Sequence, residues 1–227
     1  MNPIVPIFHI NSNQRTIDAS SIDNYRINDF GNGFFISEDG FLASVAHVFE
    51  CKIDFKPYAF LNDKFYKIDV LSTKHTANNE NHIDAAIGKI EFDNVYFFDP
   101  EKFERVKEKS KLRLTGFSRK FALYKSPNSF SLLKPCSYFY EIEALCLSTT
   151  HCCSVNPKQT HIIMKHSFEI KIESNYTDFD GMSGCPVLFK NDIVVGIFKG
   201  GTVVGNWIFG NAIHINTIKD MYLNLLK

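Results

Sequence analysis

A serine between glycines stands in the segment Gly181-Met182-Ser183-Gly184-Cys185-Pro186-Val187. Glycine on both sides allows a sharp turn and lets a substrate approach the backbone closely. Such a turn presents the Ser183 hydroxyl while the amides of Gly181 and Ser183 point into one small space, as an oxyanion hole requires. An ordinary tight turn remains the alternative, because Gly-x-Ser-Gly is a common sequence.

A serine hydroxyl needs a neighbouring imidazole to take its proton, and the chain has eight histidines. His47 fits best, because residues 31–36 and 41–46 predict a β-hairpin and His47 follows it directly, where a helical turn would fix the ring. His82 is a rival, since it lies beside an acid. The others suit core or surface positions better: His9, His75, His151, His161, His166 and His214.

The candidate acid is Asp84, at the start of the apolar segment 83–90. A carboxylate there can accept the Nδ1 proton of His47, hold its tautomer and stabilise the imidazolium that forms. A solvated aspartate at the entry to a strand is the alternative. Asp69 and Asp93 are less suitable, because no comparable strand of small residues follows them.

The segments that must position these residues are short and rich in β-branched and aromatic residues. Glu38-Asp39-Gly40 and Asn62-Asp63 look like hairpin tips. Many short strands without alternating helices indicate an all-β fold, an antiparallel barrel or sandwich. The expected strands cover residues 33–37, 41–46, 65–71, 83–90, 112–117, 161–172 and 193–198.

A charged stretch divides the chain into halves of similar length. It predicts a linker over 99–111 between an N-terminal domain (1–98), which carries His47 and Asp84, and a C-terminal domain (112–227), which carries Ser183. Near the end, apolar residues recur at helical spacing behind Asn216 and Thr217, which can cap a helix. We therefore expect a closing helix at about 215–226.

The composition is that of a compact globular protein, with 44% hydrophobic and 22% charged residues. Lys and Arg (25) balance Asp and Glu (25), so attraction to phosphate backbones is weak and no nucleic-acid partner is expected. The sequence lacks an apolar stretch long enough to span a bilayer, and its first ten residues do not resemble a secretory signal. We expect no membrane association.

The six cysteines are not spaced like a disulfide framework, and a chain of this length does not require one. We expect mostly reduced thiols in a cytoplasmic protein. His151-Cys152-Cys153 suggests a metal site, but no CxxC or HxxxH partner accompanies it. A plain loop or strand is favoured there, and neither a metal nor a cofactor is expected.

Together the three motifs resemble the trypsin-like (chymotrypsin-fold) serine peptidases. The order His, Asp, Ser matches that family, whereas subtilisin-like enzymes run Asp, His, Ser and α/β-hydrolases run Ser, acid, His. The resemblance covers most of the chain, from the Gly-x-Gly-Phe hairpin to the final helix. It implies two antiparallel six-stranded β-barrels with His47, Asp84 and Ser183 in the cleft between them.

The resemblance also assigns roles. His47 takes the Ser183 proton, Asp84 orients His47, and the amides of Gly181 and Ser183 hold the oxyanion. Met182 replaces the aspartate that pairs with a new N-terminus in zymogen activation, so activation by N-terminal clipping is not expected. Cys185 replaces the usual second glycine, and simple packing is favoured over redox sensitivity for its thiol.

The substrate pocket implied by the resemblance involves Thr177, Phe198, Lys199 and Gly200. Thr177 stands where an aspartate would select Arg or Lys, so trypsin-like selectivity is not supported unless Asp178 or Asp180 turns inward. Phe198 adds apolar surface and favours an apolar or small residue before the scissile bond (P1). An inward Lys199 would instead favour an acidic P1 residue.

The expected function is that of a serine endopeptidase that cleaves proteins or peptides through an acyl-enzyme. Without a visible activation device, a regulatory protein partner or a conformational switch is expected to restrain it. The alternatives are a catalytically silent binding module of the same fold, an esterase using the same triad, and a non-catalytic interaction protein whose motifs are accidental.

Overall fold

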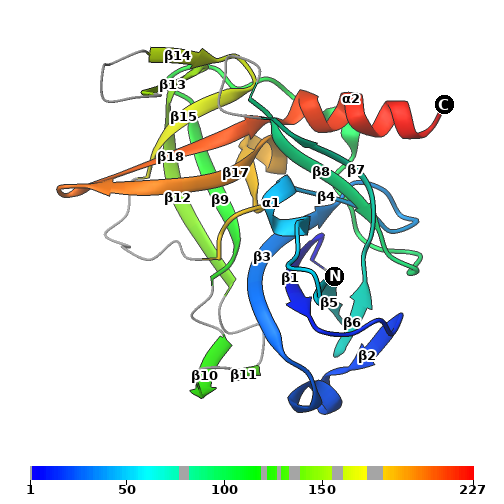
Figure 1. Ribbon diagram of the computed structural model, residues 1–227. Coiled ribbons are helices and arrows are strands. Elements are labelled where there is room, and N and C mark those ends of the chain that lie inside the picture. Colours follow the sequence, from blue (N-terminus) through cyan, green and yellow to red (C-terminus); the bar gives the residue numbers. More distant parts are fainter. Residues whose placement is uncertain are drawn as a thin grey trace.

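Strands form nearly all of the regular structure of this protein. The computed structural model describes residues 2–76, 82–118, 122–126, 129–132, 139–154, 161–172 and 181–227. These residues form an eight-stranded sheet, a closed six-stranded barrel and two short hairpins, with the helices α1 and α2 (Figure 1). The predicted all-β class is confirmed.

The first half forms one antiparallel sheet with the strand order β2-β6-β5-β1-β3-β4-β8-β7. Its two edges, β2 and β7, do not pair with each other among the described residues, so the sheet curls without closing. The closed six-stranded barrel expected here is therefore not confirmed, because additional strands extend the sheet to two free edges. The strands are β1 (Ile4–Ile10), β2 (Thr16–Asp18), β3 (Ile27–Phe35), β4 (Phe41–Ser44), β5 (Lys56–Leu61), β6 (Lys64–Lys67), β7 (Asp69–His75) and β8 (Asp84–Lys89).

Two predicted hairpins of this sheet are present. In the first, β3 and β4 pair through Phe34 and Ala43, and Gly40 turns the chain with φ +88°. In the second, Asn62 and Asp63 join β5 to β6 with φ 51° and 57°, the left-handed pair typical of a tight two-residue turn. The short 3-10 helix η1 (Ala19–Asn24) follows β2.

Between the two halves, residues 90–110 contain the 3-10 helix η2 (Pro100–Lys102) and no strand. The second half closes into a barrel with the order β12-β15-β18-β17-β16-β9, as expected for that half. Its strands are β9 (Lys111–Phe117), β12 (Phe139–Ser148), β15 (Ser167–Ile172), β16 (Pro186–Phe189), β17 (Ile193–Val204) and β18 (Trp207–His214); the 3-10 helix η5 (Lys190–Asp192) lies between β16 and β17.

Two hairpins form separate two-stranded sheets outside the barrel: β10 (Ala122–Ser126) with β11 (Ser129–Leu132), and β13 (His151–Ser154) with β14 (His161–Met164). The single strand expected over 161–172 is wrong. A turn at Lys165 and His166 separates β14 from β15, which pair with different strands.

Two apolar clusters hold the structure together. The barrel interior forms one of them, around Phe168, Ile170 and Val187. The other fills the curled sheet and extends into the second half through the buried α2 residues Ile215, Ile218 and Met221. Helix α2 (Ile215–Leu225) confirms the expected closing helix and lies beside β8 (Figure 1).

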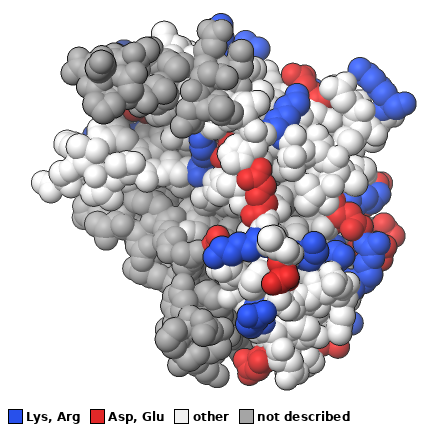
Figure 2. All heavy atoms as spheres, viewed as in Figure 1, with Lys and Arg blue, Asp and Glu red and all other residues white. Residues whose placement is uncertain are grey.

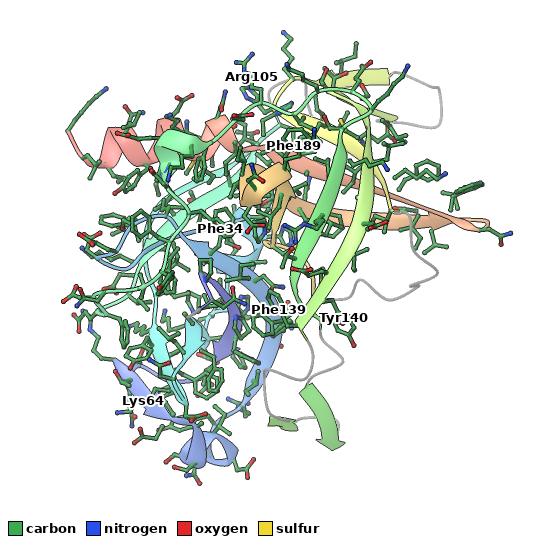
Figure 3. All side chains as sticks on the ribbon, turned by 180° about the vertical axis from the view of Figure 1, so that it is seen from behind. Phe34, Lys64, Arg105, Phe139, Tyr140 and Phe189 are labelled. Atoms are coloured by element: carbon green, nitrogen blue, oxygen red, sulfur yellow. The ribbon has the colours of Figure 1, made fainter. Side chains whose placement is uncertain are left out.

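Aromatic rings connect the outer elements to the sheet and the barrel. Phe34 of β3 packs edge-on against Phe98, with 5.7 Å between ring centroids (Figure 3). Phe139 of β12 contacts Phe117 of β9 at 5.2 Å (Figure 3). On the face shown in Figure 2, positive and negative side chains are interspersed. Of the helices described, none has the length and apolar character needed to cross a membrane.

Candidate active site

His47 lies on the one-turn helix α1 (Ala46–Phe49), directly after β4. Its neighbours Ala46, Val48 and Phe49 are buried, whereas the His47 side chain is 39% exposed. His9 of β1 stabilises α1, because its Nε2 donates a hydrogen bond to the Val48 carbonyl oxygen at 2.7 Å. Burial lowers the pKa of His9, so its ring is a neutral structural donor rather than a second base.

Asp84, the first residue of β8, holds His47 at two points. One carboxylate oxygen accepts the His47 backbone N–H at 3.1 Å, and the other lies 2.7 Å from Nδ1. The Asp84 side chain is only 1% exposed. Burial alone would raise its pKa, but the hydrogen bonds and charge of His47, together with the charge of Lys199, outweigh burial and lower it. An ionised acceptor at Nδ1 fixes the tautomer that leaves Nε2 available as a base.

Ser183 occupies the turn that leads into β16. Gly181 and Gly184 both have φ +85°, a conformation that strongly favours glycine. The Gly184 N–H donates to the Phe198 carbonyl at 2.8 Å, and the Cys185 N–H donates to the Met182 carbonyl at 3.1 Å. Within the described residues, no acceptor is bonded to the amides of Gly181 or Ser183.

Asn32 of β3 connects this turn to the curled sheet and to β9. Its buried side chain donates to the carbonyls of Gly181 (2.6 Å) and Phe117 (2.9 Å) and accepts the Phe117 N–H at 2.7 Å. Its backbone N–H donates to the Ser183 carbonyl at 2.8 Å. The sequence argument gave Asn32 no role, although an asparagine between two glycines in a strand, Gly31-Asn32-Gly33, was a visible signal of a backbone contact.

Gly31 brings the histidine helix and the serine turn to the same place. A Cβ atom at Gly31 would lie 2.6 Å and 2.8 Å from the two Val48 methyl groups and 3.3 Å from the Ser183 carbonyl oxygen. Val48 is the residue after His47. Helix α1, which carries His47, and the turn that carries Ser183 therefore approach each other at Gly31.

The Ser183 hydroxyl does not bond to His47 in this structure. Its Oγ donates instead to the Lys199 carbonyl oxygen at 3.0 Å. Within the described residues, no hydrogen bond is made by His47 Nε2. The structure therefore contains no hydrogen bond between the Ser183 hydroxyl and the His47 ring.

His82, the rival base, has both ring nitrogens occupied by other partners. Its Nδ1 lies 2.6 Å from the Thr76 carbonyl, to which it donates, and its Nε2 accepts from the Lys199 ammonium at 2.5 Å. The ring is buried. Asp84 bonds to His47 and not to His82, so of these two histidines His47 is the one whose Nδ1 has a carboxylate partner.

The four expected pocket residues differ in how far the structure describes them. Thr177, Asp178 and Asp180 lie outside the described residues. Phe198 is buried, and its ring passes 2.7 Å from the position that a Cβ would take on Gly210. The Lys199 ammonium contacts His82, and no atom of the described residues lies within 4 Å of the position that a Cβ would take on Gly200.

Two further sequence expectations concern the turn itself. Met182 and Cys185 are both fully buried in the barrel cluster. Burial raises the pKa of the Cys185 thiol, which makes it a packing group rather than a reactive one. Cys51, Cys146 and Cys185 are free thiols. Among the described residues, no group of three or more His, Cys, Asp or Glu side chains is placed to hold a metal ion.

Comparison with solved structures gives the fold. The active form of the Rv3671c protease from M. tuberculosis is similar over 96% of this chain and 78% of its own, with a TM-score of 0.62 at 16% identity. The chain has the trypsin-like serine protease fold. The MamO protease domain from Magnetospirillum magneticum covers 84% of this chain and 87% of its own (TM-score 0.55, 12% identity).

A third neighbour of the trypsin-like fold is the HtrA-type protease AlgW with a tripeptide, which is similar over the whole of this chain and 60% of its own, with a TM-score of 0.61 at 12% identity. No protein-family model and no curated protein sequence matches the chain. The resemblance predicted from the motifs is thus confirmed for the fold. Sequence identities of 12% to 16% show the fold alone, so any catalytic activity has to be argued from the geometry of the site.

Proposed function

We propose that this protein is a serine endopeptidase with the catalytic triad Ser183, His47 and Asp84. The observation that carries the proposal is the pair of hydrogen bonds from the buried, ionised Asp84 carboxylate to the backbone N–H and Nδ1 of His47. The turn that carries Ser183 approaches the helix of His47 at Gly31. The trypsin-like fold of the chain supports it. The proposed substrates are proteins or peptides, and neither a metal nor a cofactor takes part.

In the proposed reaction, His47 Nε2 removes the Ser183 proton as Oγ attacks the carbonyl carbon of the scissile bond. The amides of Gly181 and Ser183 stabilise the oxyanion, and the imidazolium is stabilised by Asp84. His47 then gives the proton to the leaving amine, so that the C–N bond breaks and an acyl-enzyme remains. A water molecule, deprotonated by His47, hydrolyses the ester and restores Ser183.

The proposed pocket includes Thr177, Phe198, Lys199 and Gly200. The Phe198 ring occupies space above Gly210, which supports a preference for a small or apolar P1 residue. The contact between the Lys199 ammonium and His82 removes the argument for an acidic P1 residue as long as that contact is kept.

We further propose that the enzyme is cytoplasmic and restrained by a partner protein or a conformational switch. The free thiols support a reducing compartment. The bond from Ser183 Oγ to the Lys199 carbonyl supports a resting state that must rearrange before catalysis. Solved structures of Rv3671c include an active and an inactive form, so two forms occur in one similar protein.

The same bond favours a second candidate, a catalytically silent binding module of this fold. Labelling with a fluorophosphonate separates the two. We expect wild-type protein to be labelled at Ser183 and to cleave members of a peptide library, and Ser183→Ala protein to do neither. Absence of labelling under all conditions that keep the protein folded would favour the binding module. Cleavage of activated esters without cleavage of any peptide would identify an esterase.

A further inference from the structure

One lysine side chain connects the two halves of the protein at the candidate site. Lys199 lies on β17 of the barrel, and its backbone carbonyl accepts the Ser183 hydroxyl at 3.0 Å. Its side chain reaches the first half, where the ammonium lies 2.5 Å from His82 Nε2. Because His82 is two residues before Asp84, this contact brings a positive charge to the start of β8.

The His82 ring is placed to accept a hydrogen bond from this ammonium. It is only 3% exposed, and its Nδ1 lies 2.6 Å from the Thr76 carbonyl oxygen. A carbonyl oxygen can only accept, so the ring proton is on Nδ1, and Nε2 carries the lone pair that receives a lysine proton. Thr76 is in turn bonded to Ile83 through two hydrogen bonds. A buried and doubly anchored ring therefore fixes the position of the Lys199 charge.

The negative group beside this charge is the Asp84 carboxylate. Among the described residues, this buried carboxylate accepts hydrogen bonds only from His47. A buried carboxylate is costly unless donors or a cation compensate its charge. Burial raises the pKa of Asp84, but its contacts with His47 and the charge of Lys199 lower it. Lys199 therefore supplies part of the compensation.

Other titratable groups surround Lys199, Asp84 and His47. Within the part of the chain that the structure describes, they are His82 before β8, His75 of β7, Glu50 after α1, His9 of β1, Asp29 of β3, His151 of β13 and Glu169 of β15. Glu50 is bound to His75 at 2.8 Å. Burial lowers the pKa of both His9 and His151, so neither ring holds a positive charge at neutral pH. Lys199 is thus the lysine whose charge acts on Asp84.

We propose that the Lys199 ammonium, held by His82, opposes protonation of His47 and so keeps this base available at lower pH. The Asp84 carboxylate stabilises the imidazolium form of His47, and a cation beside that carboxylate offsets part of the stabilisation. The Lys199 side chain is a positioning group, because it acts on His47 through Asp84. This inference rests on the proposed function, in which His47 removes the Ser183 proton.

The test is the pH dependence of fluorophosphonate labelling, whose acid limb reports protonation of the free base. Lys199→Met removes the charge, and Lys199→Gln removes it while keeping an N–H that can donate to His82. Both variants keep the backbone carbonyl that binds Ser183 Oγ. For both we expect the pH of half-maximal labelling to rise by roughly 0.5 pH unit, with the rate on the plateau unchanged or higher. Lys199→Arg should keep the wild-type limb.

A merely structural role gives a different result. It would reduce the labelling rate by the same factor at every pH, and that outcome, or an unmoved limb in both neutral variants, would overturn the proposal. The matched control is Lys190→Met, the same change at an exposed lysine beyond the end of β16 that is farther from Ser183. It should leave the profile as in wild-type protein. Thermal unfolding checks that each variant is folded over the pH range used.

Variants of His82 test how the charge is held. His82→Leu removes the acceptor and should also raise the pH of half-maximal labelling, because the ammonium is then free to turn to water. His82→Gln, whose amide oxygen can accept from the ammonium, should keep the wild-type limb. An unmoved limb in His82→Leu would refute the role assigned to His82.

NMR titration of the His47 ring separates failure of this inference from failure of the proposed function, because it does not depend on activity. We expect the midpoint of the His47 titration to lie at higher pH in Lys199→Met than in wild-type protein. If wild-type protein is neither labelled nor active, the higher midpoint still supports the effect of Lys199 on His47. If wild-type protein is labelled and the midpoints are equal, the proposed function stands and this inference is refuted.

Discussion

Replacing Asn32 by alanine tests whether one buried amide holds the candidate active site together. The change removes two donated hydrogen bonds, to Gly181 and Phe117, and leaves the Phe117 N–H without its acceptor. The orphaned N–H costs about 1–3 kcal/mol and each lost donation about 0.5–1.5 kcal/mol, so we expect the free energy of unfolding to fall by about 3 kcal/mol. For a chain of this size, that corresponds to a Tm lower by roughly 10 °C.

Activity should fall for a separate reason. The Asn32 side chain fixes the Gly181 carbonyl, and its loss loosens the turn that carries Gly181 and Ser183. Because loss of one oxyanion donor costs about 10²–10³ in rate, we expect fluorophosphonate labelling to slow by at least tenfold. Thermal unfolding and labelling rates are measured at a temperature where both proteins are folded.

The matched control is Asn13→Ala, the same chemical change at an exposed position. It should leave both the Tm and the labelling rate at their wild-type values. If Asn32→Ala protein also keeps both values, the argument that Asn32 joins the serine turn to the sheet is refuted. A lower Tm with unchanged labelling would limit Asn32 to a role in stability.

Three further predictions follow from the same contacts. Asp84→Asn should fold but lose about 10⁴-fold in kcat for peptide hydrolysis, because an amide cannot hold the Nδ1–H tautomer of His47; loss of less than tenfold would contradict the triad. Since burial lowers the pKa of His9, its contribution to stability is complete above about pH 6.5 and is lost as the pH falls through its folded pKa. His9→Gln should therefore flatten the fall in unfolding free energy between pH 7.5 and 5, measured by urea denaturation, and an unchanged slope would refute this. Gly184→Ala should lower the Tm by several degrees in thermal unfolding, because its Cβ would lie 2.0 Å from the Asn32 carbonyl at φ +85°; a wild-type Tm would contradict that geometry.

Local patterns in the sequence predicted much of the fold. Alternating strand residues and turn sequences identified the β3–β4 hairpin, the Asn62-Asp63 turn and the final helix, because short-range chemistry determines each of them. Strand β1 was missed, since prolines hide its pattern. Pro6 is tolerated there because β1 pairs with β5 only from Ile7 onward, so the absent N–H faces no partner.

In the candidate site too, local sequence predicted some residues and missed the contacts between distant segments. His47 and Asp84 were recognisable because each stands next to a strand of distinctive composition, and the structure joins them by two hydrogen bonds. Contacts over long sequence separations were not predictable from local pattern. Asn32 bonds to residues 85 and 149 positions away, and Lys199 meets His82 at 117, so only the folded chain shows them.

The position of α2 has a consequence for how the protein is made. This helix is synthesised after every strand, yet Ile215, Ile218 and Met221 belong to the apolar cluster of the first sheet, and Tyr222 packs on Phe41 at 5.4 Å. As the chain leaves the ribosome, the part of this apolar surface that α2 covers stays exposed until this late segment arrives. The core of the first half is therefore complete only after the second half has been made, and a ribosome that stalls before α2 would release a protein with an exposed apolar flank.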